Sequence, residues 1–172
     1  MDYRSEIPTW AFINGQIIQD AVRSGDLSRS IERVERSYGL SPGSLKIINP
    51  AYMISLLYCL LVVPKVLCPD PKLAAMLGVL DPKSVLKLVT ISRSASTPNS
   101  ERDAVLDLVR HLRNALSHVR SEISDNGDFT FWDQKGSSSP INFQATFTRL
   151  NLEKFLNTVG SVLANKVRSG SQ

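Results

Sequence analysis

Cysteine and histidine are both rare in this sequence. The chain has two of each, and its cysteines, Cys59 and Cys68, lie in or beside an apolar stretch. Two cysteines offer too few ligands for a structural zinc site, and nothing else suggests export to a compartment where disulfides form. We therefore expect two buried, reduced thiols, and neither a metal ion nor another cofactor.

The sequence also lacks a long hydrophobic run. The longest apolar stretch, 51–63, is shorter than the roughly 20 residues that a membrane-spanning helix needs, and Pro64 follows it directly. The N-terminal residues 1–6 lack the basic-then-apolar order of a signal peptide. We interpret the stretch as a buried core helix and expect a soluble, cytoplasmic protein that does not contact membranes.

Dense charge of one sign is missing as well. The chain has 20 Lys and Arg against 16 Asp and Glu, a formal net charge of +4, and no run of basic residues. Such a chain can attract RNA, but coating a polyanion non-specifically would need clustered charge. With 172 residues, 42% of them hydrophobic, and no internal repeat, the sequence predicts one domain over 1–172 with a sizeable core.

Helical periodicity dominates what is present. Apolar residues recur at spacings of three and four, and capping residues, prolines and glycines mark the ends of these segments. The predicted helices cover about 8–22, 26–38, 50–63, 72–77, 82–91, 99–118 and 151–167. Pro64 is expected to kink or end the third of these helices, and a polar connector is expected over 92–100.

Two short strands are predicted late in the chain. Residues 129–132 and 142–147 are rich in aromatic and β-branched side chains, and the turn pair Asn126-Gly127 precedes the first of them. The expected fold class is therefore mainly α: a helical bundle with a small β-hairpin insertion, about 123–148, before the final helix. The rings of Phe129, Phe131 and Trp132 would either cover the core or stack on bases.

The predicted helix over 99–118 has one apolar and one polar side. Turned by about 100° per residue, it places seven apolar side chains on one side. These residues are Val105, Leu108, Val109, Leu112, Ala115, Leu116 and Val119. The opposite side carries Asp107, Arg110, His111, Asn114 and His118. Arg113 projects from the other edge, about 140° round from His118, and its long side chain could still swing toward a ligand.

The residue types on this polar side suit phosphate chemistry. Imidazole titrates near neutrality and moves protons, and guanidinium holds a phosphate through two hydrogen bonds. Both histidines of the chain lie on this helix. A solvated face without function is an open alternative. A metal site formed by Asp107, His111 and His118 is disfavoured, because the two histidines are two helical turns apart.

The segment His111–His118 resembles the hallmark of the HEPN superfamily. That hallmark is an arginine, a polar residue and a histidine four to six residues after the arginine, here Arg113, Asn114 and His118. The resemblance extends over about 100–166 and implies a HEPN-like helical bundle. It also implies a metal-independent endoribonuclease that acts as a homodimer and leaves a 2′,3′-cyclic phosphate.

The resemblance assigns roles to the three motif residues. Arg113 would hold the scissile phosphate, His118 would act as general acid or base, and Asn114 would orient His118 or touch the phosphate. The helical positions of Asp107, Arg110 and His111 add them as groups that contact RNA or support the motif.

The resemblance leaves the biological role open. A defence or toxin-like enzyme with an antitoxin or effector partner is one possibility, but Arg120 replaces the tyrosine of the subgroup that pairs with nucleotidyltransferase antitoxins. A non-catalytic HEPN-like dimer that binds nucleotide, nucleic acid or a protein is the alternative function. A purely structural helical domain is the third hypothesis.

Overall fold

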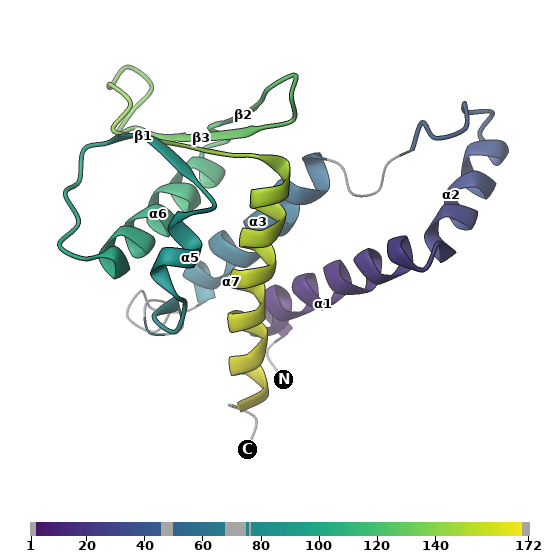
Figure 1. The fold of residues 1–172 in the computed structure, drawn as a ribbon, viewed down its shortest axis with the longest axis horizontal. Helices are drawn as coiled ribbons and strands as arrows, with labels where there is room; N and C mark the ends of the chain where they lie inside the picture. The colour runs from purple at the N-terminus through teal and green to yellow at the C-terminus, as the bar shows by residue number, and fades with distance from the viewer. Residues whose placement is uncertain (1–2, 46–49, 68–74, 76, 170–172) are drawn as a thin grey trace.

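The computed structural model describes residues 3–45, 50–67, 75 and 77–169, and it combines a group of helices with one antiparallel sheet (Figure 1). The helices are α1 (Tyr3–Arg23), α2 (Asp26–Ser37), α3 (Pro50–Leu67), α5 (Pro82–Leu86), α6 (Glu101–Ser117) and α7 (Arg149–Ser169). The strands are β1 (Thr90–Ser94), β2 (Ser121–Ile123), β3 (Phe129–Asp133) and β4 (Phe143–Phe147).

Helix α3 lies at the centre of the helical layer. It packs against α1, α6 and α7, and its Leu57 and Leu60 are completely buried. Of the two outcomes expected at Pro64, a kink or an end, the end was wrong, because the helix continues past Pro64 to Leu67. Burial of the apolar helix offsets the roughly 3 kcal/mol that an internal proline costs. Among the described residues, no helix is both long and apolar enough to span a bilayer.

Helix α2 extends away from this layer at the end of α1 (Figure 1). Its buried Glu35 accepts hydrogen bonds from the backbone of Gly43 (3.0 Å) and Leu45 (2.9 Å), which fix the segment after the helix. These backbone donors lower the pKa of Glu35 from its ordinary value.

The sheet has the strand order β1-β4-β3-β2, and all its neighbouring strands are antiparallel. Alternate residues of β3 and β4 are buried on one face, and β3 packs against α6. The side chains on this face are Phe129, Phe131, Asp133, Phe143, Ala145 and Phe147. Phe129 and Phe131 are completely buried, so these rings cover the core and do not form a surface for stacking bases.

The predicted fold class, a mainly α HEPN-like helical bundle with a small β-hairpin insertion before the final helix, was wrong. The sheet has four strands, and β1 comes before α6, so the fold is a mixed α and β structure. The predicted helix over 82–91 ends at Leu86, and β1 occupies the boundary between that range and the expected connector. Strand β1 is exposed at every residue, and it therefore shows no apolar alternation that sequence analysis could detect.

Parts of two other expectations lie outside the described residues. Residues 72–74 and 76 of the predicted helix over 72–77 are among these, and so is Cys68. Cys59 is a free, partly buried thiol of α3. Burial raises the pKa of its thiol, which favours the protonated and less reactive form.

Candidate functional site

Helix α6 carries the motif residues, and its start is capped by its own side chains. The Ser100 hydroxyl oxygen accepts from the backbone N–H of Asp103 (3.1 Å), and the hydroxyl donates to the Asp103 carboxylate (2.8 Å). Glu101 and Asp103 place negative charge in the first turn, where the helix dipole is favourable for it. The completely buried Leu108 and Leu112 anchor the opposite face in the core.

His118 lies at the point where α6 ends. The N–H of Arg120 donates to the carbonyl of Ala115 (2.8 Å), and the N–H of Val119 donates to that of Leu116 (3.2 Å). This is the Schellman pattern, which normally has glycine at the position of Val119. Val119 has φ 54° and is 86% exposed. A β-branched residue in this conformation is strained, and the strained residue directly follows the exposed His118.

The Asp133 carboxylate joins α6 to the end of β3. It accepts from His111 Nδ1 (2.8 Å), Asn114 Nδ2 (2.9 Å) and, at longer range, Arg120 Nη1 (3.4 Å). Burial opposes the ionisation of Asp133, but the hydrogen bonds from Asn114 and His111 outweigh it and lower the pKa of this carboxyl from its ordinary value. The carboxylate is therefore a fixed negative charge beneath the polar side of α6.

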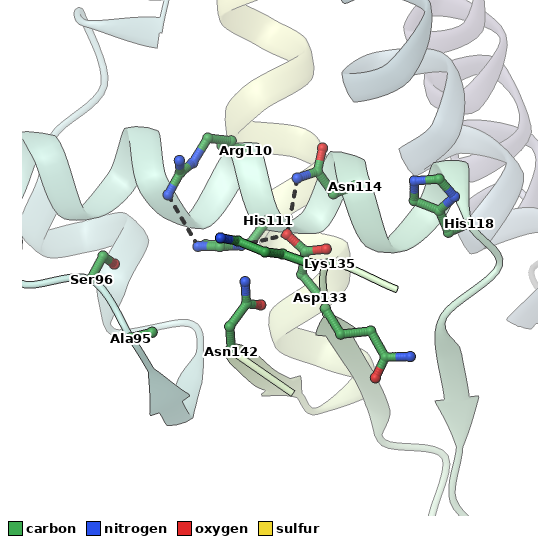
Figure 2. Close-up of a pocket in the computed structure, with 10 residues that line it drawn as sticks. Ala95, Ser96, Arg110, His111, Asn114, His118, Asp133, Lys135 and Asn142 are labelled. Carbon is green, nitrogen blue, oxygen red and sulfur yellow. Dashed lines mark hydrogen bonds and ion pairs between the residues drawn. The ribbon is translucent and has the colours of Figure 1, made fainter. Parts of the chain in front are cut away.

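His111 is held on three sides and is only 6% exposed. Its ring stacks on Phe143 with centroids 4.3 Å apart and planes 8° apart. With its proton on Nδ1, the ring donates to Asp133, and Nε2 then accepts from Arg110 Nη2 at 3.2 Å (Figure 2). His111 thus supports neighbouring groups, since both its ring nitrogens already have protein partners.

Arg110 reaches from the surface toward the cluster formed by Asp133, His111 and Asn114. It pairs with Asp107, which in turn accepts from the Ser96 hydroxyl and lies 3.5 Å from His111 Nε2. The Arg110 side chain is still 54% exposed, whereas that of Asp107 is 14% exposed. Arg110 can therefore offer its remaining N–H groups to a ligand, while Asp107 fixes its orientation.

A polar cavity of about 480 Å³ opens beside α6. It is lined by Ala95, Ser96, Arg110, His111, Asn114, His118, Asp133, Gln134, Lys135 and Asn142. Figure 2 shows His118 at the helix end, apart from the cluster around Asp133. Four of the six predicted site residues therefore line one pocket: Arg110, His111, Asn114 and His118. Asp107 does not line it, but it contacts His111, which does.

Arg113 does not line this pocket. It is 7% exposed and belongs to the buried side of α6, although the helical positions placed it at an edge that a ligand could reach. The structure thus separates the two residues that the sequence motif pairs: His118 faces the cavity from the surface, and Arg113 is enclosed in the fold.

Six residues that line the pocket were not predicted from the sequence: Ala95, Ser96, Asp133, Gln134, Lys135 and Asn142. One signal for Asp133 was available, because it continues the alternation of Phe129 and Phe131 and so falls on the buried face of β3. A carboxylate in phase with two core aromatics needs polar partners. Lys135 and Asn142 flank the loop between β3 and β4 and carry no such pattern.

The described residues contain no group of three or more His, Cys, Asp or Glu side chains that could hold a metal ion. The polar lining of the pocket consists of one exposed imidazole, the buried His111 ring, two cationic side chains, three amides, the Ser96 hydroxyl and the Asp133 carboxylate.

We predict that Asp133→Asn weakens the dependence of the free energy of unfolding on pH in the acid range. The folded-state pKa of Asp133 is lowered, so its stabilisation is fully present above the ordinary value of about 3.9 and is lost as the pH falls through the folded-state value. The free energy of unfolding should differ most between wild type and Asp133→Asn above about pH 5 and converge in acid. Urea denaturation from pH 7 to pH 2 measures this, with the exposed Asp125→Asn as control. A pH-independent difference would contradict the assignment.

We predict that Val119→Gly stabilises the protein. Glycine adopts positive φ without strain, and little packing is lost at a side chain that is 86% exposed. The free energy of unfolding should rise by about 0.5–1 kcal/mol, measured by chemical denaturation. Val119→Ala should give a smaller change, because alanine lacks the branched Cβ but keeps the cost of positive φ. A destabilised Val119→Gly would show that the strain is not present in solution.

Comparison with known proteins gives one match. No curated protein and no solved structure matches the chain. The family model described as HEPN pEK499 p136 matches residues 6–169, a range that includes α6, the sheet and every residue of the pocket. HEPN domains generally bind RNA and often dimerise. The match confirms the resemblance seen at His111–His118: the chain belongs to the HEPN superfamily, in the family HEPN pEK499 p136.

Proposed function

We propose that this protein is a metal-independent endoribonuclease that leaves a 2′,3′-cyclic phosphate. At the level of the superfamily, membership supports a nuclease-like or nucleotide-binding function. The observation that carries the more specific proposal is the pocket beside α6, where His118, Asn114 and Arg110 line one polar cavity. A proton-transfer group and a phosphate-binding cation on one helix face are the parts that such a cleavage needs.

The proposed reaction is a transfer within the RNA strand. The ribose 2′-oxygen attacks the adjacent phosphorus as a general base removes its proton, and the P–O5′ bond breaks as a general acid protonates the leaving oxygen. The products are a 2′,3′-cyclic phosphate and a 5′-hydroxyl. His118 is the exposed imidazole of the pocket, and it serves as the acid or the base.

The negative charge that develops on the phosphate needs a cation within reach. Arg110 lines the cavity and is half exposed, whereas Arg113 is buried and lies outside it. We therefore assign the phosphate contact to Arg110 and give Arg113 a supporting role inside the fold. Asn114 donates to Asp133 through Nδ2, and its amide holds the lining of the pocket in place.

The proposal includes two kinds of protein contact. A homodimer would bring a second His118 to the same RNA, so that one imidazole acts as base and the other as acid. An antitoxin or effector partner fits a defence or toxin-like role in the cytoplasm. Arg120, at the position of the tyrosine of one antitoxin-paired subgroup, binds the carbonyl of Gln134 (2.5 Å) and so supports the pocket wall.

We predict that His118→Ala abolishes RNA cleavage without unfolding the protein. The exposed imidazole has little packing to lose, and loss of an acid or base group lowers the rate by about 100-fold or more. The assay follows end-labelled RNA and tests the product for a terminal phosphate that resists phosphatase until acid opens the ring. Ser117→Ala, an exposed neighbour outside the cavity, is the control. Loss of cleavage on adding EDTA would contradict the metal-independent mechanism, and RNA binding without any product would favour the non-catalytic alternative.

We predict opposite behaviour for the two arginines. Arg110→Ala should lower cleavage by about 10-fold or more through the lost phosphate contact, with the free energy of unfolding changed by at most about 0.5 kcal/mol. Arg113→Ala should lower the free energy of unfolding by about 2 kcal/mol or more, because a buried group is removed. Cleavage rates and urea denaturation curves of both variants test this. If Arg113→Ala is stable but inactive while Arg110→Ala remains active, the phosphate contact belongs to Arg113 and the assignment to Arg110 is wrong.

A further inference from the structure

Asn142 lines the pocket and carries an unused acceptor. Its backbone N–H donates to the carbonyl of Asp133 (3.0 Å), and its carbonyl accepts from the N–H of Ala95 (2.8 Å). The main chain at Asn142 is therefore fixed from both sides, by the ends of β3 and β1. Its side-chain Oδ1 is buried and finds no hydrogen-bond partner in the described part of the chain.

An unsatisfied buried amide oxygen is costly to the free protein. Such a group has given up its hydrogen bonds to water without gaining one from the protein. Asn142 lines the cavity, and Figure 2 shows its amide directed toward the side of the cavity that His111 forms. If the Asn142 amide turns this oxygen into the cavity, a ligand that brings an N–H donor there would satisfy it, and the fixed main chain would hold the residue in place.

Positive charge lies on the same cavity. Lys135 is exposed on the loop after β3 and lines the cavity. Arg110 approaches from α6 with more than half of its side chain exposed. Cations that line a cavity together with an amide match a ligand that combines a phosphate with a planar group bearing N–H donors and acceptors. A nucleotide has this composition, and about 480 Å³ lies within the range of small-ligand pockets.

We propose that this pocket is a nucleotide subsite in which Lys135 and Arg110 bind the phosphate and Asn142 reads the base. The inference rests on the proposed function and adds to it a base preference next to the scissile phosphate. An asparagine amide pairs best with adenine, accepting from N6–H and donating to a ring nitrogen. Adenine is therefore the expected base, and Asn142 is the residue that sets specificity.

Binding of mononucleotides tests the subsite without cleavage. AMP, CMP, GMP and UMP are titrated into the full chain by calorimetry. AMP should bind most tightly, and Asn142→Ala should remove that advantage, a loss of about 10-fold or more. Lys135→Ala should weaken all four nucleotides to a similar degree, about fivefold. Asn126→Ala and Lys83→Ala, exposed and outside the cavity, are the matched controls.

Cleavage provides the second measurement. The substrates are oligonucleotides in which every ribose but one is 2′-O-methylated, with each of the four bases placed on either side of the single cleavable bond. Wild type should prefer adenine on one side, and Asn142→Asp should move the preference toward guanine, whose N1–H and N2–H offer adjacent donors to a carboxylate.

The outcomes separate the two proposals. Equal binding of the four nucleotides, or an AMP preference that survives Asn142→Ala, overturns the subsite even if RNA is cleaved. A preference for AMP that depends on Asn142, without any cleavage of RNA, supports the subsite and overturns the proposed catalysis.

Discussion

The Asp133 carboxylate is the contact on which the arrangement of the site depends. It lies at the end of β3, opposite Phe143 of β4, and it receives His111 and Asn114 from α6. Because this carboxylate is buried, it is tolerated only while its donors remain in place. The same bonds fix the imidazole that orients Arg110, so the helix, the sheet and the cationic wall of the cavity are set by one negative charge.

The sequence predicted helices well where burial is one-sided. In α6, the apolar stripe through Leu108 and Leu112 matches the face that the structure buries, except at the exposed Val119, and the predicted start at about 99 lies next to the observed cap, Ser100. Strand β1 was not predicted, because its pairing with β4 is made by backbone atoms and its side chains are exposed on both faces. The pairing of β1 depends on residues of β4 about 50 positions away in the chain. The local periodicity of a sequence does not reveal such a pairing.

The sequence predicted that the polar side of α6 is exposed along its length, but the structure exposes only part of it. His118 remains at the surface, but His111, two turns earlier, is covered by Asp133 and Phe143. Arg113 differs in the same direction, since a residue expected at a reachable edge is also enclosed. A helical wheel gives angles around the axis, but it does not show where a sheet or another helix covers the polar arc. The depth of each side chain therefore had to come from the tertiary structure.

The position of α6 between β1 and the other strands has a consequence for synthesis of the chain. A ribosome completes α6, with His118 at its end, before it adds Asp133, Lys135 or Asn142. The imidazole is thus made earlier than the opposite wall of the cavity. A nascent chain that ends at the helix lacks the cavity, so a ligand of this pocket finds no finished site until the later strands have joined the sheet.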